Sequence, residues 1–457
     1  MKVLGVSEGF HDASASLVEV SPYTDKVSIQ WAAQAERYSG RKNDPFLPPE
    51  LLNVNADVSV FYEDTKLKNE RRTYHSMSPV TYSNICQHHL NHHQSHAAAA
   101  YYTAPFNDDT VIVVIDAIGE WACSSIWVPK EFGLECVWEE KYPHSIGLFY
   151  SAITKRLGLK PNEDEYITMG MAAFGEPIVS MRWCFDLPDR NWHKGFGVFD
   201  FQGCAPEDIA ASAQFEVENR IHAIMLKARE YGSNICYGGG VALNCVANSK
   251  VLPRLFNKIW IFPNPGDGGS SLGAALGYIC RQVEFKDCFL GHNIEGVLNP
   301  KTVVDTLIAN KVVGVANGRA EFGPRALGNR SLLGDPRYNI KGKVNKIKRR
   351  QKFRPFAPAI LEEYANMYFD GEKNEYMQFV SRARHDHKSV THVDGTARVQ
   401  VVKEDSSSIL RKILEEFYNR TGCPMLLNTS LNIKGKPMVN TRKDGKAFEK
   451  LYGVKVF

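Results

Sequence analysis

Short apolar runs and segments of helical periodicity alternate along the first 290 residues. The apolar, β-branched runs predict strands over residues 2–7, 14–20, 27–33, 111–116, 123–128, 234–238 and 258–262. Apolar positions at helical spacing predict helices over residues 92–103, 147–157, 207–231 and 271–281. The early strands have hairpin spacing, whereas the later ones alternate with helices. This order indicates a mixed α/β fold rather than a pure repeat of parallel strands and helices.

The pattern changes near residues 285–305, and a second α/β region follows. This region predicts strands near 312–317, 376–382, 397–403 and 424–428, and helices near 340–350 and 406–420. Between them, Pro355 and Pro358 favour an extended, strand-like path for the stretch KFRPFAPAI. We therefore expect a domain junction, with one domain over residues 1–290 and another over residues 300–457.

The distribution of charge supports this division. The 457 residues include 55 basic and 51 acidic side chains, a net charge of +4. Residues 1–295 hold 25 basic and 35 acidic side chains, a net of −10, and residues 296–457 hold 30 and 16, a net of +14. With 44% hydrophobic and 23% charged residues, the composition is that of a globular protein and excludes disordered, collagen-like and coiled-coil chains.

The sequence predicts a cytoplasmic protein. No apolar run approaches the ~18 residues that a membrane-spanning helix needs, and the N-terminus reaches polar residues too early for a secretory signal. The ten cysteines contain no C-x-x-C pair, so we expect free thiols rather than a disulfide framework or a zinc knuckle.

A histidine-rich segment, HHLNHHQSH at residues 88–96, is the first candidate for chemistry. His92 and His96 are four residues apart, so on a helix their rings share one face and can bind one metal ion. Asp116 ends the apolar run VIVVIDAI, and carboxylates at strand ends face the ligand crevice of α/β sheets. The structural alternatives are satisfied core histidines and an aspartate that caps a turn.

Two glycine-rich loops follow predicted strands. The first, YGGGVALNCVAN, contains Gly239, Gly240 and Asn244, and the second, GDGGSSLGAAL, contains Asp267. Such loops present backbone N–H groups to phosphate, and a helix that follows adds its positive N-terminal dipole. A tight turn with close helix packing is the alternative for each loop alone. Together they favour a nucleotide-binding crevice, with Asp267 as a third acid near it.

The C-terminal region is rich in basic residues. The stretch GRAEFGPRALGNRS places Arg319, Arg325 and Arg330 among glycines, and no acid occurs between Asp335 and Glu362. A basic run is most often a solvated helix face. On the extended path predicted here, however, Lys352 and Arg354 would point to the same side and could hold one polyanion. Downstream, Thr429, Ser430 and Asn432 follow a short apolar strand and could bind phosphate or carboxylate.

Taken together, the motifs resemble the O-carbamoyltransferases of the nodulation (NodU), cephamycin (CmcH) and tobramycin (TobZ) type. The resemblance extends from Val3 to about Thr441. It rests on the motifs GFHDASASLVE, NHHQSHAAAA, IDAIGEW, YITMGMAAFGEP, GGGVALN, GDGGSSLGAAL, EFGPRALGNRSLLGDPR, FRPFAPAI and LLNTSLNIKGKP. It implies an N-terminal ASKHA (actin/sugar-kinase) domain of two RNase H-like lobes, similar to TsaD, and a C-terminal YrdC-like α/β domain.

The resemblance also implies a two-step reaction. The YrdC-like domain would make carbamoyl adenylate from carbamoyl phosphate and ATP with Mg²⁺, and the ASKHA-like site would transfer the carbamoyl group to an acceptor hydroxyl. The K-x-R and S-x-N signatures of the YrdC fold match Lys352/Arg354 and Ser430/Asn432, and the three arginines would join them in binding ATP and carbamoyl phosphate.

For the transfer site, the resemblance implies a divalent metal ion held by His92, His96, Asp116 and Asp267. Two imidazoles and two carboxylates suit iron(II), with manganese(II) or zinc(II) as alternatives. His11 is the expected base for the acceptor proton, and Asp12 would orient its ring. The expected adenylate-binding residues are Glu120, Gly239, Gly240 and Asn244.

Other functions remain open at this point. A threonylcarbamoyl-type tRNA modification system normally divides these two domains between separate proteins. Hydrogenase-maturation chemistry would require C-x-x-C zinc pairs, which are missing from this sequence. A non-catalytic ATP-binding protein would leave the histidine cluster without a role. The acceptor could be a sugar or natural product, or a hydroxymethylated pyrimidine of a nucleotide or of DNA. The resemblance allows for a homodimer, and the sequence predicts no membrane partner.

Overall fold

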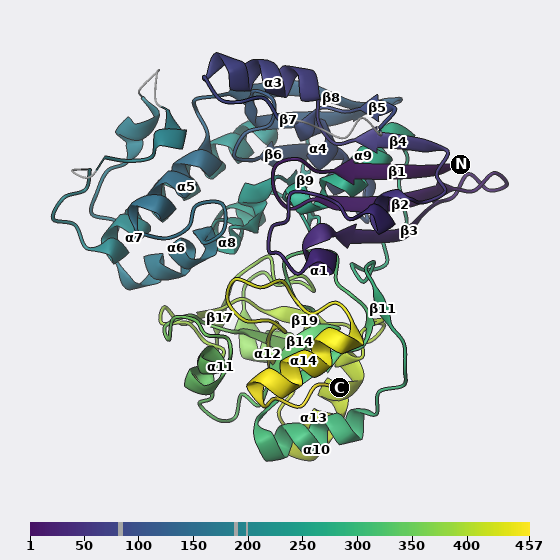
Figure 1. The fold of residues 1–457 in the computed structure, drawn as a ribbon. Coiled ribbons are helices and arrows are strands. Elements are labelled where there is room, and N and C mark those ends of the chain that lie inside the picture. The colour runs from purple at the N-terminus through teal and green to yellow at the C-terminus, as the bar shows by residue number, and fades with distance from the viewer. Residues whose placement is uncertain (81–85, 187–190, 198–199) are drawn as a thin grey trace. The chain divides into compact units, whose positions relative to one another are not determined.

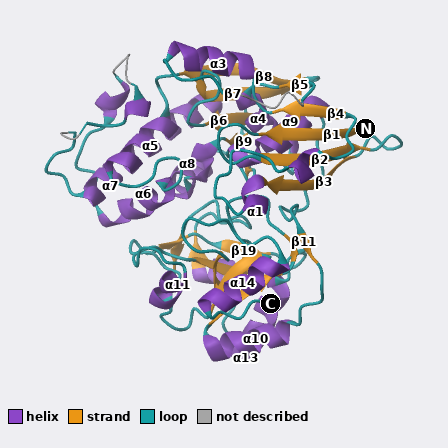
Figure 2. Cartoon of the chain, viewed as in Figure 1, coloured by secondary structure: helices purple, strands orange, loops and turns teal. Residues whose placement is uncertain are grey.

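A computed structural model describes residues 1–80, 86–186, 191–197 and 200–457. The chain divides into two compact units. Unit 1 contains residues 1–30 and 54–285, and unit 2 contains residues 31–53 and 286–457. The segment 31–53 therefore packs with the C-terminal part of the chain, although it precedes most of unit 1 in the sequence. Both units contain helices and strands (Figure 2).

The first sheet of unit 1 has the strand order β3-β2-β1-β4-β5 (Figure 1). β1 pairs antiparallel with β2 and parallel with β4, and β4 pairs parallel with β5. The strands are β1 (Lys2–Ser7), β2 (Ser14–Val20), β3 (Val27–Gln34), β4 (Val58–Phe61) and β5 (His88–His89). Gly5, Ser7 and the inner residues of β2 are buried, so both faces of these strands are covered, as in α/β proteins.

The second sheet repeats this order, as β8-β7-β6-β9-β10. β6 pairs antiparallel with β7 and parallel with β9, and β9 pairs parallel with β10. The strands are β6 (Thr110–Ile115), β7 (Ala122–Lys130), β8 (Gly133–Lys141), β9 (Asn234–Gly238) and β10 (Ile259–Ile261). All six residues of β6 are buried, which explains its uninterrupted apolar sequence.

The helices of unit 1 pack on the sheets and on one another, and some cover strands that lie far from them in the sequence. α9 packs against α4, β1 and β2, and α7 packs against α5, α6 and α8. Their bounds are α3 (Thr65–Tyr74), α4 (His92–Tyr102), α5 (Ile146–Arg156), α6 (Glu165–Met171), α7 (Pro206–Ala228), α8 (Cys245–Leu255) and α9 (Ser270–Ile279). The alanines of α4 and the small residues of α9 allow these two helices to approach closely.

Unit 2 is built on a five-stranded sheet of order β12-β14-β20-β15-β19. The first four strands pair antiparallel, and β15 pairs parallel with β19. Their bounds are β12 (Val312–Ala316), β14 (Arg330–Gly334), β15 (Ala357–Leu361), β19 (Gln400–Val402) and β20 (Met425–Ser430). The minor strands are β11 (Asn293–Ile294), β13 (Gly318–Arg319), β16 (Phe369–Asp370), β17 (Ser381–Ala383) and β18 (Thr396–Ala397).

Five helices of unit 2 contribute to one hydrophobic core with this sheet: α10 (Pro300–Asn310), α11 (Lys341–Ile347), α12 (Glu362–Tyr368), α13 (Leu410–Thr421) and α14 (Arg442–Tyr452). The segment 31–53 adds the short helices α1 (Ala35–Ser39) and α2 (Pro49–Leu52) to this unit. Within the described residues, no helix combines the length and the apolar character that crossing a bilayer requires.

The mixed α/β class expected from the sequence is confirmed, but three expected strand segments are wrong. Residues 397–403 divide between β18, which ends at Ala397, and β19 (Gln400–Val402), and these belong to different sheets. Residues 376–382 do not form one strand, because Met377 adopts a left-handed backbone with φ of 57° and only Ser381–Ala383 pair. Lys352 lies in a turn and β15 begins at Ala357, so Lys352 and Arg354 are not neighbours on one strand face. The stretch is not helical, as the prolines predict, but it becomes a strand only at Ala357, so that Pro355 precedes the strand and Pro358 lies within it.

Candidate active site

Four side chains of unit 1 converge on one point. His92 and His96 lie one turn apart on α4, Asp116 directly follows β6, and Asp267 begins the short 3-10 turn before α9. One ligand atom from each lies within 4.8 Å of the others. All four residues are at most 9% exposed. The structure therefore brings together the four residues that the sequence suggested.

The separations of these atoms match the coordination shell of one metal ion. The Nε2 atom of His92 lies 3.0 Å from Asp116 Oδ2, 3.4 Å from Asp267 Oδ1 and 3.1 Å from His96 Nε2. His96 Nε2 is 3.3 Å from Asp267 Oδ1. Ligands at about 2.1 Å around a tetrahedral ion would be about 3.4 Å apart. The residues present thus fit a divalent cation.

The electrostatics of the cluster also favour a cation. Burial alone would lower the pKa of His92, but Asp267, Asp116 and Glu63 around it raise that pKa well above its usual range. Burial would raise the pKa of Asp267, but the facing His92, His96 and His11 hold it well below its ordinary value. The acids therefore stay ionised, and His92 carries positive charge beside them.

The loop after Asp116 fixes where α4 begins. Glu120 is buried, and its Oε1 accepts hydrogen bonds from the backbone N–H groups of His92, at 2.9 Å, and Asp64, at 2.8 Å. Asn91, the N-cap residue, provides no side-chain cap, so Glu120 satisfies a free N–H at this helix end from another part of the chain. A Cβ at Gly119 would lie 3.0 Å from His92 Cβ, so a glycine allows this close approach.

His11 and Asp12 lie beside the metal-ligand candidates. His11 Nδ1 is 3.0 Å from Asp12 Oδ2, and its Nε2 is 3.7 Å from Asp267 Oδ2. Burial would lower the pKa of His11, but the bond to Asp12 and the charges of Asp267 and Asp116 raise it to about 9. Asp12 accepting from Nδ1 leaves Nε2 directed toward the cluster, the arrangement expected of a base and its orienting acid.

The residues expected to bind an adenylate form internal contacts in this structure. The amide of Gly240 donates to Asp116 Oδ1 at 2.8 Å and so orients that carboxylate. Asn244 exchanges two hydrogen bonds with the Gln214 amide and caps α8 through Ala247 N. Glu120 holds the start of α4. Gly239, with φ of 87°, leads the chain from β9 into this turn.

A second cluster lies in unit 2 and centres on Lys348, which the sequence reasoning missed. Its Nζ donates to Ser430 Oγ at 3.1 Å, Asn432 Oδ1 at 2.8 Å and the carbonyls of Ser430 and Asn432. Lys348 is 4% exposed. Burial and the positive charges of Arg350, Arg354 and Lys42 lower its pKa well below the usual value.

The K-x-R spacing occurs twice in this basic stretch, as Lys348/Arg350 and as Lys352/Arg354. The structure brings Lys348 to Ser430 and Asn432, whereas Lys352 is exposed. The sequence alone offered both pairs, and the earlier one sits just beyond the helical stretch that ends at Ile347. In this structure Lys348, and not Lys352, is therefore the lysine that contacts the S-x-N segment.

The three arginines expected to bind phosphate differ in their surroundings. Arg330 is fully buried and donates to five carbonyl groups, those of Asn317, Gly318, Asn329, His292 and Asn440. Arg319 donates to the carbonyls of Leu290 and Gly291. Both side chains therefore hold loops together in this structure, and their expected role in binding ATP and carbamoyl phosphate stays a prediction. Arg325 and Arg354 are half-buried.

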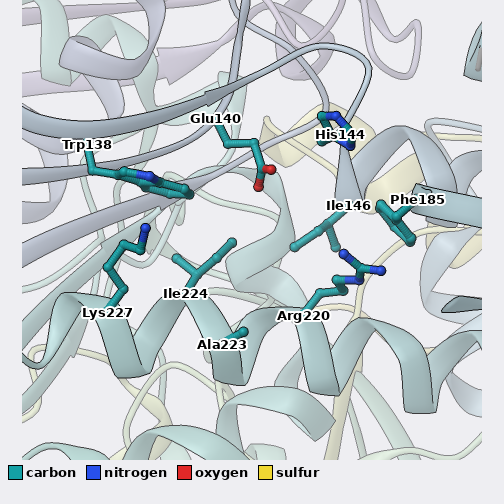
Figure 3. A pocket seen from close by; sticks show the side chains of 9 residues that line it. All are labelled: Trp138, Glu140, His144, Ile146, Phe185, Arg220, Ala223, Ile224 and Lys227. Carbon is teal, nitrogen blue, oxygen red and sulfur yellow. The ribbon is translucent and has the colours of Figure 1, made fainter. Parts of the chain in front are cut away.

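A pocket of about 160 Å³ lies elsewhere in unit 1, between β8 and α7 (Figure 3). Lys227 Nζ lies 4.6 Å from the Trp138 ring centroid, and the Arg220 guanidinium lies 4.1 Å from the Phe185 ring. Both cations thus pack against aromatic walls. None of the site residues expected from the sequence lines this pocket.

Two family comparisons cover most of the chain. The family described as "Carbamoyltransferase C-terminus" matches residues 304–456, and the family described as "Carbamoyltransferase N-terminus" matches residues 83–182 and 191–276. The two matches contain the four clustered side chains of unit 1 and the Lys348 cluster of unit 2.

Individual relatives are similar over long stretches. An uncharacterised protein of Synechocystis is 31% identical over 97% of this chain and 93% of its own length. Nodulation protein NolO of Bradyrhizobium diazoefficiens is 32% identical over 78% of this chain and 75% of its own length. Nodulation protein U of Sinorhizobium fredii is 34% identical over 51% of this chain and 46% of its own length.

Solved structures resemble the chain only distantly. The activator of 2-hydroxyisocaproyl-CoA dehydratase from Clostridium difficile, with bound ADPNP, is 15% identical and matches 61% of this chain and 95% of its own, with a TM-score of 0.39. A similarity of this size carries no argument about function.

Proposed function

The chain belongs to the carbamoyltransferase family and is a carbamoyltransferase, and from this premise we propose that it is an ATP-dependent O-carbamoyltransferase with two reaction sites. Carbamoyl adenylate forms in unit 2, and its carbamoyl group passes to an acceptor hydroxyl in unit 1. The observation that carries the proposal is the four-residue cluster of unit 1 with His11 beside it. A base next to a buried cation site is the equipment for activating a hydroxyl.

In the first step, Lys348, Ser430 and Asn432 bind the phosphate groups of the substrates. Carbamoyl phosphate reacts with water to give carbamate and phosphate. A carbamate oxygen then attacks the α-phosphorus of ATP. The bond from that phosphorus to the oxygen that bridges to the β-phosphate breaks, and pyrophosphate leaves. The surroundings of Lys348 support this role. Among the described residues its ammonium group donates to neutral oxygens, and a bound phosphate would give this buried positive charge a negative partner.

In the second step, the acceptor oxygen attacks the carbonyl carbon of carbamoyl adenylate. The new C–O bond replaces the bond to the phosphate oxygen, AMP leaves, and the acceptor proton passes to His11 Nε2. Asp12 keeps the proton of the neutral ring on Nδ1 through its 3.0 Å contact, so that Nε2 can accept. Burial in unit 1 protects the reactive adenylate from water.

His92, His96, Asp116 and Asp267 would hold the metal ion of this site. Such a cation polarises a carbonyl or a hydroxyl and offsets the carboxylate charges that raise the pKa of His11. Mixed imidazole and carboxylate ligands favour iron(II), with manganese(II) or zinc(II) as alternatives.

We extend the proposal to the domains. Residues 1–290 would form the ASKHA-like transfer domain of two RNase H-like lobes, and residues 300–457 the YrdC-like domain that uses ATP. The repeated strand order of the two sheets in unit 1 supports the first assignment. The Lys348 contacts to Ser430 and Asn432 support the second.

The test separates the two steps. The protein is incubated with ATP, Mg²⁺ and carbamoyl phosphate, and pyrophosphate release is measured with and without acceptors. Mass spectrometry then seeks the gain of one carbamoyl group on sugars, on hydroxymethylated pyrimidine nucleotides and on DNA. Absence of pyrophosphate under all conditions would refute the adenylate route. For DNA, binding that weakens steeply with salt would identify phosphate contacts.

A further inference from the structure

A buried ion pair lies directly behind the metal-ligand candidates. Glu63 follows β4, is fully buried, and its two carboxylate oxygens lie 2.8 and 2.7 Å from Lys68 Nζ. Lys68 is 4% exposed and lies in the first turns of α3. Asp64 caps this helix by accepting from the amides of Lys66 and Leu67, which fixes the approach of Lys68 to Glu63.

The carboxylate of Glu63 also faces the metal-ligand histidine. Its Oε2 lies 3.6 Å from Nδ1 of His92, beyond hydrogen-bond distance. This Nδ1 atom is buried and has no hydrogen-bond partner within the described part of the chain. The opposite ring nitrogen, Nε2, faces Asp116 and Asp267. Glu63 and the metal-ligand carboxylates therefore lie on opposite sides of one imidazole.

This arrangement meets a requirement of histidine ligation. A histidine that gives its Nε2 lone pair to a cation carries its proton on Nδ1, and a buried N–H needs an acceptor. Carboxylates commonly fill this role behind metal-ligating histidines, where they fix the ring and increase its basicity. Bonding to Lys68 keeps Glu63 ionised despite complete burial, since an unpaired buried carboxylate would be costly.

We propose that Glu63, held by Lys68, is a positioning residue that accepts the Nδ1 proton of His92 and thereby sets the metal affinity of the transfer site. This inference rests on the proposed function, because it presupposes a cation at the four-residue cluster. Lys68 has a further contact that links the pair to the proposed base: its Nζ lies 5.1 Å from the ring centroid of Phe10, the residue before His11.

The double variant Glu63→Leu/Lys68→Met tests the inference. It removes the carboxylate acceptor but leaves the net charge near the cluster unchanged, so a change in metal affinity reflects the lost contact rather than the lost charge. We expect the dissociation constants of zinc(II) and manganese(II), measured by competition with a chelator, to rise by about 10- to 100-fold.

A matched control comes from unit 2. Asp335 is fully buried and forms a bidentate pair with Arg337, at 3.0 and 2.8 Å. Asp335→Asn/Arg337→Met removes an ion pair whose carboxylate is as buried as that of Glu63, although Arg337 itself is exposed, and should lower thermal stability without changing either dissociation constant. Equal metal affinity in the wild type and the Glu63 double variant would overturn the inference. An equal loss of metal affinity in the Asp335 control variant would overturn it as well.

A measurement on the unmodified protein covers the case in which the double variant does not fold. In the zinc-loaded protein, labelled with ¹⁵N at histidine, His92 should carry its proton on Nδ1 and show a proton resonance shifted downfield by a carboxylate acceptor. A His92 proton on Nε2 would overturn the inference. A wild-type chain that binds no divalent cation at all would refute the metal site of the proposed function as well, which separates the two failures.

Discussion

Replacing Lys348 or Lys352 by methionine distinguishes the two K-x-R pairs of the basic stretch. Lys348 is buried and its ammonium group donates hydrogen bonds to Ser430 and Asn432, whereas Lys352, four residues later, is exposed. Methionine keeps a long, unbranched side chain and removes the charge from either position. Both variants lose one positive charge from the same region, so a general electrostatic effect on ATP would be similar in the two. A specific contact would be lost in Lys348→Met alone.

The expected size follows from the chemistry of the contact. A hydrogen bond to a charged group contributes about 1.5–3 kcal/mol, which is about 10- to 100-fold in affinity. We therefore expect Lys348→Met to weaken the binding of ATP or carbamoyl phosphate by at least this factor and to abolish pyrophosphate release. Lys352→Met should remain within about twofold of the wild type, as isolated exposed charges contribute little.

Calorimetry adds a pH signature. Burial and the neighbouring arginines lower the pKa of Lys348, so the free site loses its proton at a lower pH than an ordinary lysine. Phosphate binding favours the charged form, and binding should take up protons and weaken as pH rises through the lowered pKa. Titrations in buffers of different ionisation enthalpy measure this uptake. Unchanged binding in Lys348→Met, or proton uptake that survives it, would refute the reasoning.

Three further changes test unit 1. His92→Ala/His96→Ala should abolish carbamoyl transfer, measured by mass spectrometry of the acceptor, and spare pyrophosphate release; equal loss of both would contradict two separate sites. Glu120→Gln weakens the hydrogen bonds that the Glu120 carboxylate accepts from the amides of His92 and Asp64. It should lower the free energy of unfolding, measured by urea titration, by about 1.5–3 kcal/mol. An unchanged midpoint of urea unfolding would contradict the capping role of Glu120. Gly119→Ala places a Cβ 3.0 Å from that of His92, which should displace the His92 side chain and lower the metal affinity measured by competition with a chelator. An unchanged metal affinity would show that the loop around residue 119 adjusts instead.

The transfer cluster could be predicted from the sequence because its signals are local. His92 and His96 share a helix face by their spacing alone, and Asp116 ends a run of residues that must be a buried strand. The resemblance to the O-carbamoyltransferases, and not these local signals, implied that Asp267 joins them in one metal site. The histidine signal depends on one helix being assigned correctly, and the Asp116 signal depends on one strand.

Residues that act through long-range contacts gave no comparable signal. Glu63 follows a short strand, β4, that the hydrophobic pattern did not predict, and its contact with His92 joins positions 29 residues apart. Lys348 and Lys352 have the same spacing to an arginine, and the fold alone selects between them. Arg330 lies in a glycine-rich motif typical of phosphate binding, but its guanidinium is taken by backbone carbonyls that only the folded loops bring together.

The two sites gather buried charge of opposite sign, and this difference supports the ligand proposed for each. In unit 1, Asp116 and Asp267 face His92 and His96, and a divalent cation that takes the imidazole lone pairs would supply the positive charge beside the two carboxylates. In unit 2, Lys348 contacts neutral oxygens and has Arg350 nearby. A buried charge without a partner destabilises a fold, and a ligand of opposite sign removes that penalty and stabilises the native state. A divalent cation and inorganic phosphate should therefore each raise the thermal stability, through different units. His92→Ala/His96→Ala should remove the response to the cation alone, and Lys348→Met the response to phosphate alone.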